Sequence, residues 1–579
     1  MARTVAIGHQ DFETVRKNDY FYIDKTDFIR EWWENGDSVT LITRPRRFGK
    51  TLNMSMLEKF FSVNYAGRAD LFEGLDIWKQ KKFREIQGTY PVISLSFAGI
   101  KETTFLETRK KICQTITEVY NKCDFLMDSD LLNEKEKAFI QEISVDMEDY
   151  AATSSLKVLS DYLSRYYGKK VIILLDEYDT PMQEAYVNGF WEELVAFTRS
   201  LFNSTFKTNP YLERAIMTGI TRVSKESIFS DLNNLEVVTT TSDKYENAFG
   251  FTEQEVFATL EEFQLSENKQ DVKNWYDGFT FGKVSDIYNP WSIINYIDKK
   301  KLTTYWANTS SNSLVNKLIR EGSSEIKQDF EELLKGGVLE TVIDEQIVFS
   351  QLSTKESAIW SLLLACGYLK VVQYTLDEPS GREYYVLALT NKEVRIMFQN
   401  MIRDWFSEEE PGYNNFIKAL LADNLDAMNE YMNRVAMATF SYFDTGKNSS
   451  VEEPERLPTG KAITKGLKGP NPSDCFYHGL VLGLMVDLAG RYVITSNRES
   501  GFGRYDVILE PLSRQDDAMI LEFKVFRPKK EKSLEDTVKY ALEQIEDKNY
   551  AASLTAKGFP EEQIRKYGFA FRGKEVLIG

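Results

Sequence analysis

The first residues that could do chemistry lie at the end of residues 38–51, SVTLITRPRRFGKT. Lys50 can reach the β- and γ-phosphate oxygens of a nucleotide, and the hydroxyl of Thr51 can ligate Mg²⁺. The amides of the preceding turn and of a following helix would hold the phosphates. These residue types in this order predict a phosphate-binding P-loop. The predicted nucleotide contacts in this loop are Arg46, Arg47, Phe48, Gly49, Lys50 and Thr51.

A second stretch, residues 169–181 (KKVIILLDEYDTP), ends an apolar run in two carboxylates. Asp176 is expected to hold Mg²⁺ directly or through water, and Glu177 to orient and polarise the attacking water. A strand that ends in Asp-Glu is common, and its carboxylates are usually solvated. Together with the loop at Lys50, however, the pair predicts a nucleotide-binding site.

The loop departs from the complete G-x-x-x-x-G-K-[ST] pattern at its first position. Arg44 stands where that pattern has glycine, and Pro45 removes one amide donor. Arg44, Arg46 and Arg47 are expected to compensate in part, because they place cations beside the phosphates.

A further strand could contribute to the same site. Residues 214–220 (RAIMTGI) predict a buried strand, which is followed by Thr221 and Arg222. Thr218 is a candidate sensor of the γ-phosphate, and Arg222 could stabilise the charge that develops on it. The alternative is a capped strand end with a surface arginine, and the sequence leaves both interpretations open.

A third set of chemical residues lies near the C-terminus. Asp506 is followed by a strand-like run, AMILEFKV, in which Glu522 and Lys524 share one face. The two carboxylates could bind Mg²⁺ or Mn²⁺, and Lys524 could position a hydroxide and stabilise phosphorane charge. This D-x(15)-E-x-K pattern is typical of PD-(D/E)XK nucleases, in which the following helix often supplies a polar residue, here Gln544. The alternative is a structural ion pair on a strand.

Positioning these residues requires two α/β units. The apolar runs before the P-loop, in residues 90–97 and before Asp176 predict parallel strands of one sheet that is covered on both faces. Helical patterns and aromatic turns after Phe249 predict a helical linker, and a loop rich in Gly, Pro and Lys precedes the last unit. The predicted domains are a P-loop NTPase (1–245), a helical linker (246–410) and a restriction-endonuclease-like α/β domain (411–579).

Composition narrows the class of protein. The net charge of −17 lies in residues 1–450, because residues 451–579 hold 20 basic and 20 acidic residues. This argues against non-specific nucleic-acid binding by the N-terminal part and leaves it open at the C-terminus. Four cysteines without C-x-x-C spacing and two histidines give no credible zinc site. Without a signal peptide or a long apolar run, we expect a cytoplasmic protein without membrane contact.

Seven motifs follow one another along the chain: RPRRFGKTLN, VIILLDEYDTP, WYDGF, YNPW, FYHGLVLGL, GFGRYDVIL and ILEFKV. In this order they resemble a prokaryotic family in which an AAA-ATPase-like domain is joined to a C-terminal PD-(D/E)XK nuclease-superfamily domain. The likeness covers nearly the whole chain, and the family's P-loop also has the RPRRFGK form. The resemblance implies nucleotide-site roles for Lys50, Thr51, Asp176 and Glu177, and nuclease-core roles for Asp506, Glu522 and Lys524, with Glu499, Gln544 and His478 as neighbours.

Three functions are compatible with these residues. In the first, ATP binding or hydrolysis gates a metal-dependent nuclease that acts on DNA, using ATP and Mg²⁺, with Mn²⁺ as an option at the nuclease site. In the second, a nucleotide-driven switch or scaffold carries a C-terminal domain that binds nucleic acid or a partner without cleavage. In the third, an interaction protein has lost nucleotide cycling at its Arg44-Pro45 loop. The first is preferred, because a pure binder needs no carboxylates beside a polyanion; an oligomer is compatible with all three.

Overall fold

Two compact units make up this computed structural model, Met1–Val315 with Val338–Ile396, and Asn316–Gly337 with Met397–Gly579. Within the described residues, no helix combines the length and the apolar character that crossing a membrane requires. The predicted boundaries at residues 245 and 410 stay predictions. The structure describes residues 3–221, 228–229, 232–307, 313–344, 352, 356–379, 381–405, 413–439, 485, 488, 491–496, 499–500, 503–504, 507–528 and 530–579.

The first unit is built around a five-stranded parallel sheet with the strand order β2-β3-β4-β1-β5. β1 and β3 are buried along their whole length, as expected for apolar strands that are covered on both faces. The predicted parallel sheet is therefore confirmed, and β4 lies between the P-loop strand β1 and the Asp176 strand β3. The strands are β1 (Val39–Thr43), β2 (Val92–Ser96), β3 (Val171–Asp176), β4 (Leu212–Gly219) and β5 (Leu235–Val238).

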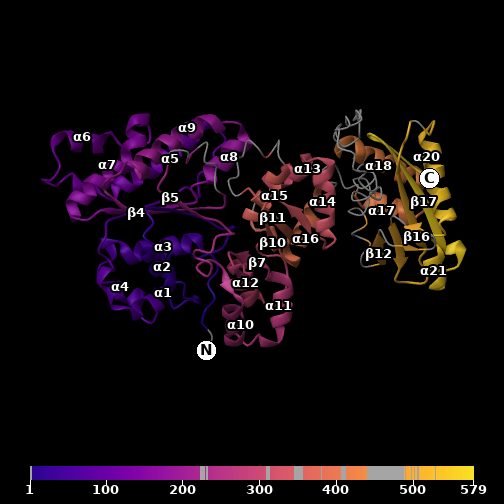
Figure 1. Cartoon of the computed structure of the whole chain (residues 1–579), viewed down its shortest axis with the longest axis horizontal. Helices are drawn as coiled ribbons and strands as arrows, with labels where there is room; N and C mark the ends of the chain where they lie inside the picture. Colours follow the sequence, from indigo (N-terminus) through magenta and orange to yellow (C-terminus); the bar gives the residue numbers. More distant parts are fainter. Residues whose placement is uncertain are drawn as a thin grey trace. The chain divides into compact units, whose positions relative to one another are not determined.

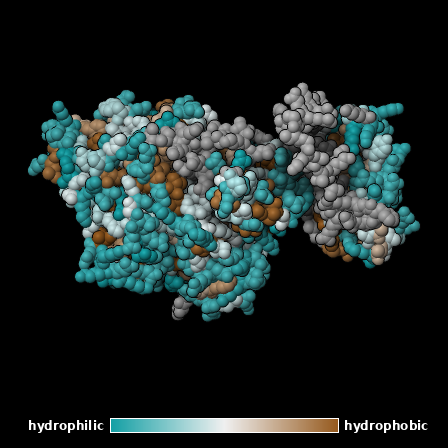
Figure 2. Space-filling view, in the orientation of Figure 1, coloured by the Kyte–Doolittle hydropathy of each residue, from teal (hydrophilic) through white to brown (hydrophobic). Residues whose placement is uncertain are grey.

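Helices cover both faces of this sheet, with α5 to α9 on one side and α1 to α4 on the other (Figure 1). Over α1 to α4, the face drawn in Figure 2 is mostly hydrophilic, in keeping with the acidic composition. The helices are α1 (Phe12–Lys17), α2 (Asp27–Asn35), α3 (Lys50–Phe61), α4 (Lys81–Ile86), α5 (Phe105–Asn121), α6 (Glu134–Glu142), α7 (Asp149–Tyr167), α8 (Thr180–Asn188) and α9 (Trp191–Phe202).

The middle region is helical, as predicted, and it also carries two small antiparallel sheets, β6-β8-β7 and β10-β11-β9. Tyr276, Tyr288 and Tyr296 belong to one buried apolar cluster, so these aromatic residues form a core. The elements are β6 (Phe251–Thr252), α10 (Glu253–Glu262), α11 (Lys269–Tyr276), β7 (Phe279–Phe281), β8 (Val284–Tyr288), α12 (Pro290–Lys299), α13 (Ser313–Glu321), α14 (Ser324–Leu334), β9 (Leu339–Thr341), α15 (Glu356–Ala365), β10 (Leu369–Asp377), β11 (Arg382–Leu389) and α16 (Lys392–Trp405).

The second unit contains a five-stranded mixed sheet with the order β12-β15-β16-β17-β18, in which β16 and β17 are parallel. On β16, Met519, Leu521 and Phe523 pack in the cluster of α17 and α18, whereas Ile520 packs against α20. The predicted C-terminal α/β domain is confirmed, and its sheet is consistent with a PD-(D/E)XK fold. The elements are α17 (Tyr413–Leu421), α18 (Leu425–Thr439), β12 (Tyr492–Ser496), β13 (Glu499–Ser500), β14 (Gly503–Arg504), β15 (Val507–Pro511), β16 (Ala518–Val525), α20 (Leu534–Asp547), α21 (Ala552–Ala556), β17 (Ile564–Arg572) and β18 (Glu575–Ile578).

Candidate functional site

The predicted P-loop connects β1 directly to the N-terminus of α3. The strand ends at Thr43, and Gly49 is the N-cap of the helix with φ of 83°, a conformation that favours glycine. Lys50 is the first helical residue and is only 4% exposed. Its Nζ donates to the carbonyl oxygens of Arg44 and Pro45, both at 2.9 Å. The loop therefore folds around the ammonium group that is predicted to reach the phosphates.

Burial changes the charge equilibrium of this lysine. Desolvation lowers the pKa of Lys50, and the nearby carboxylates of Glu177, Asp179 and Asp176 oppose that shift. An anionic phosphate beside Lys50 would act in the same direction as these carboxylates and favour the charged ammonium.

The Asp176 carboxylate accepts hydrogen bonds from hydroxyl groups on two elements. Thr51 Oγ1 on α3 donates to Asp176 Oδ2 at 2.7 Å, and Thr218 Oγ1 on β4 donates to Asp176 Oδ1. Desolvation raises the pKa of Asp176, while the two hydroxyl groups and Lys50 oppose the rise. A threonine hydroxyl beside a carboxylate is a set of hard oxygen donors, which fits Mg²⁺. The structure thus brings together three residues that the sequence analysis predicted for one site.

Glu177 follows Asp176 in an unusual backbone conformation. Its φ is 50°, which places a non-glycine residue in the left-handed region at a cost on the order of 1–3 kcal/mol. Its N–H donates to Thr218 Oγ1 at 3.2 Å, and its carboxylate accepts from Thr180 Oγ1 at 3.2 Å. These contacts hold the strained residue with its side chain at the wall of the cavity that Lys50 also lines.

Asp179 is a further carboxylate of this motif, to which the sequence analysis gave no role. It is 1% exposed and accepts the backbone N–H groups of Ile220 and Thr221 at 2.9 and 3.0 Å. Gln183 also donates to it at 3.1 Å. Asp179 therefore fixes the turn after β4 to the turn after β3; the only sequence signal was a third acid in DEYDTP.

The three arginines of the loop have different environments. Arg44 is fully buried, donates to the carbonyls of Thr43 and Thr239 at 3.0 and 2.6 Å, and lies 4.5 Å from the ring centroid of Phe281. Burial lowers its pKa to about 9, so the group stays cationic at neutral pH. The prediction that Arg44 places a cation beside the phosphates is wrong, because carbonyl groups and aromatic rings hold it in the interior.

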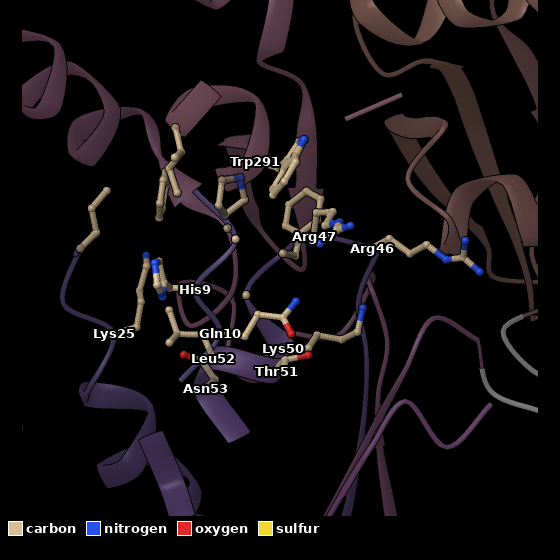
Figure 3. Close-up of a pocket in the computed structure, with 18 of the residues that line it drawn as sticks. His9, Gln10, Lys25, Arg46, Arg47, Lys50, Thr51, Leu52, Asn53 and Trp291 are labelled. Atoms are coloured by element: carbon tan, nitrogen blue, oxygen red, sulfur yellow. The ribbon is translucent and has the colours of Figure 1, made fainter. Parts of the chain in front are cut away.

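Arg46 and Arg47 both line the cavity. Arg46 donates to Gln183 Oε1 at 3.2 Å, and in Figure 3 its side chain is directed away from Lys50. The Arg47 guanidinium lies 4.6 Å from the ring centroid of Trp291 (Figure 3). Their contact with phosphate stays a prediction.

Of the two remaining predicted nucleotide contacts, Phe48 lies within the described residues and Arg222 does not. Phe48 is buried against the rings of Phe279 and Phe281, with centroids 4.7 and 5.3 Å away. Any contact of Phe48 with nucleotide therefore involves its backbone. Arg222 lies outside the described residues.

A cavity of about 350 Å³ lies above the P-loop. Beyond the predicted residues, it is lined by His9, Gln10 and Lys25 from the N-terminal segment and by Trp291 of α12. In Figure 3, His9 and Lys25 lie at the end of the cavity opposite Arg46. The sequence analysis missed these residues, since neither a lone histidine nor the YNPW turn is a specific signal.

The C-terminal candidate site is centred on β16. Glu522 is 1% exposed and its Oε1 accepts from Lys524 Nζ at 2.7 Å and from Gln544 Nε2 of α20. Gln544 Nε2 also donates to the hydroxyl of Tyr550 at 3.0 Å, a residue that the sequence analysis did not consider. The structure thus brings Glu522, Lys524 and Gln544 together as predicted. Asp506 and His478 lie outside the described residues, and Glu499 is in β13, where its side chain is not described.

An acidic cluster that the sequence analysis left without a role lies in the middle region. Carboxylate oxygens of Glu253, Asp277 and Asp286 lie within 4.8 Å of one another. Lys273 forms ion pairs with Glu253 and, at 3.2 Å, with Asp286. Burial, together with the neighbouring Asp286, raises the pKa of Asp277 to about 7. The ammonium group of Lys273 and a proton retained on Asp277 therefore neutralise much of the negative charge of this cluster.

Two parts of the chain match models of protein families. Residues 6–229 match the family described as "Predicted AAA-ATPase", and residues 473–579 match the PD-(D/E)XK nuclease superfamily. The chain is also 26% identical over 402 residues to an uncharacterized protein in the vnfD 5′ region of Azotobacter chroococcum mcd 1, and this alignment covers 68% of both proteins. The predicted combination of two domain families is confirmed.

Proposed function

Because the chain joins an AAA-ATPase-like domain to a PD-(D/E)XK nuclease-superfamily domain, we propose that it hydrolyses ATP and that this gates a metal-dependent nuclease acting on DNA. The proposal assigns nucleotide binding to the cavity above the P-loop. It assigns phosphodiester cleavage to the site on β16.

The contact between α3 and β3 supports the ATPase half of the proposal best. Thr51 Oγ1 lies 2.7 Å from Asp176 Oδ2, so two oxygen atoms that fit Mg²⁺ as ligands are adjacent. Lys50 would neutralise the phosphate oxygens, and Glu177, at the wall of the same cavity, would orient the attacking water. Bound Mg²⁺ supplies further neutralisation of the phosphate charge.

The nuclease half is supported by a buried carboxylate and a lysine on one face of β16. Glu522 is an oxygen donor that fits Mg²⁺ or Mn²⁺, which would polarise a phosphodiester when bound. Lys524 has a side chain that is 26% exposed, so it can turn toward a polyanion while it remains near Glu522. Gln544 would fix the orientation of the carboxylate through its hydrogen bond.

One observation favours a second function, a nucleotide-driven switch or scaffold whose C-terminal domain binds nucleic acid or a partner without cleaving it. Glu522 and Lys524 form an ion pair at 2.7 Å, and such a pair can be purely structural. In that case the P-loop unit retains its nucleotide cycle, and only cleavage is absent.

Cleavage and ATP turnover measured on the full chain separate the two functions. Purified protein is incubated with Mg²⁺ or Mn²⁺ and with plasmid, linear or single-stranded DNA, each with and without ATP. Lys50→Ala should abolish ATP binding, and Glu177→Gln should bind Mg·ATP but turn it over slowly. Lys524→Ala should abolish cleavage and leave ATP turnover intact. Lys539→Ala, a lysine of α20 with a 75% exposed side chain, is the matched control.

Each half can fail independently. If Glu177→Gln hydrolyses ATP at the wild-type rate, a residue other than Glu177 orients the attacking water. Cleavage that survives in Lys524→Ala would exclude this site, and DNA binding without any cleavage by wild type would favour the switch.

A further inference from the structure

The P-loop carbonyl of Arg46 is held from outside the loop by two side chains of the middle region. Asn289 Nδ2 donates to Arg46 O at 3.3 Å, and Trp306 Nε1 donates to the same oxygen at 3.0 Å. Both donors are buried, with exposed fractions of 1% and 2%. One carbonyl oxygen with two lone pairs thus receives two N–H groups from residues far away in the sequence.

Both donors are themselves fixed in orientation. Asn289 Oδ1 caps α12 by accepting the N–H groups of Trp291 and Ser292 at 2.9 and 3.2 Å, which leaves its amide nitrogen for Arg46. Trp306 N–H donates to Glu393 Oε1 at 2.7 Å, and Ser292 Oγ donates to Glu393 Oε2 at 2.8 Å. A single buried carboxylate therefore holds both the start of α12 and the backbone of the tryptophan.

The peptide that carries this carbonyl also carries the N–H of Arg47. In a trans peptide the C=O and the following N–H point in opposite directions. Holding Arg46 O toward the middle region therefore turns the Arg47 N–H to the other side of the loop. Arg47 has a φ of 65°, and a left-handed residue in a loop of this kind aligns successive N–H groups into an anion-binding concavity.

We propose that Asn289 and Trp306 are positioning residues for phosphate binding, because they orient the Arg46–Arg47 peptide in a loop that has Arg44 in place of the first glycine. This rests on the proposed function of the P-loop as a nucleotide site. In the complete motif, glycine gives the loop its backbone freedom; here donors from the middle region hold the backbone in place. The middle region is then a part of the nucleotide site, and its donors act on the phosphate groups of the nucleotide through the loop backbone.

Three variants of the full chain test this. Trp306→Phe removes the indole N–H and keeps an aromatic ring, and Asn289→Ser keeps an oxygen that can cap α12 but is too short to reach Arg46 O. The dissociation constants of Mg·ATP, Mg·ADP and adenosine are measured by calorimetry for each variant and for the double variant. Tyr276→Phe is the control, since it removes a partly buried hydrogen bond to Thr303 O (2.8 Å) in the same region without altering a P-loop contact.

Each single change should raise the dissociation constants of ATP and ADP about 2- to 10-fold. The double variant should raise them by at least the product of the two single effects. Adenosine, which has no phosphate, should bind as tightly as to wild type, and Tyr276→Phe should alter melting but no affinity. A double variant that binds ATP like wild type, or single variants that lose adenosine and ATP equally, would overturn the proposal. Wild type that binds no ATP would instead overturn the proposed function.

Discussion

Thr218→Val tests whether the end of β4 acts on phosphate directly or on the Asp176-Glu177 pair. Valine has nearly the shape of threonine, so the change removes a hydroxyl group and leaves the strand packing in place. That hydroxyl donates to the Asp176 carboxylate and accepts the N–H of Glu177 at 3.2 Å. In the variant, the carboxylate loses a charge-assisted hydrogen bond and the strained Glu177 loses its backbone acceptor.

The expected size of the effect follows from these two contacts. A hydrogen bond to a charged group contributes about 1.5–3 kcal/mol, and a stranded buried N–H costs about 1–3 kcal/mol. Because Glu177 is only partly buried, water offsets some of the second cost, and we expect the free energy of unfolding to fall by about 2–4 kcal/mol. For a unit of this size the Tm should fall by about 3–5 °C.

The same change should alter the pH dependence of nucleotide binding. Burial already raises the pKa of Asp176, and the hydrogen bond from Thr218 opposes that rise. Without it the carboxylate is protonated at a higher pH, so Mg²⁺-dependent ATP binding by the variant should fail at a higher pH than in wild type.

Calorimetric melting with and without Mg·ATP measures both effects, and the ATP-induced shift identifies the transition of the first unit. Thr40→Val is the matched control, since Thr40 is equally buried on β1 and accepts from the neutral indole of Trp32 at 3.2 Å. Thr218→Ser should restore most of the stability. The reasoning is refuted if Thr218→Val melts like wild type and yet loses ATP hydrolysis, because Thr218 would then act on the phosphate itself.

Three further changes address other parts of the chain. If the ion pair of Glu522 with Lys524 is structural, Glu522→Gln should lower the free energy of unfolding without metal by about 1–3 kcal/mol. This loss is smaller than for a fully buried ion pair, because the Lys524 side chain is 26% exposed. A metal site predicts instead unchanged or higher metal-free stability and a Mn²⁺-induced rise in Tm in wild type alone. Asp277→Asn should reduce the change in Tm between about pH 4 and pH 7, measured by melting at a series of pH values. The pKa of Asp277 is raised, so in this range the folded state keeps a proton that the unfolded state releases. In wild type this contribution to stability is therefore present near pH 4 and lost toward pH 7, and the variant lacks it. Arg44→Lys should lower the free energy of unfolding by about 1–3 kcal/mol, because a single ammonium nitrogen replaces a guanidinium whose two Nη atoms donate to three carbonyl oxygens. Its ATP affinity should stay within about twofold of wild type by calorimetry, and a large loss of affinity at wild-type stability would contradict the interior role.

The sequence determined the parts of the sites that are local. The apolar run before Gly49 and the helical spacing after Lys50 predicted the loop between β1 and α3, because both patterns lie within a few residues of the motif. The alternation of β16 likewise placed Glu522 and Lys524 on one face, and the ion pair between them confirms it. Periodicity and motif order also predicted β1 to β4 of the first sheet and the α/β class of the second unit, but they did not predict the edge strand β5 (Leu235–Val238).

Only the tertiary structure decided how the loop is held. Trp306 and Arg46 are 260 positions apart, and no local pattern in the sequence relates an indole N–H to a particular carbonyl oxygen. The burial of Arg44 against Phe281 was mispredicted for the same reason, since its charge suggested phosphate while packing offered carbonyls and an aromatic face. A motif specifies which groups are available for chemistry, but the partners that fix their orientation depend on which distant segments pack together, and that is set by burial over the whole unit.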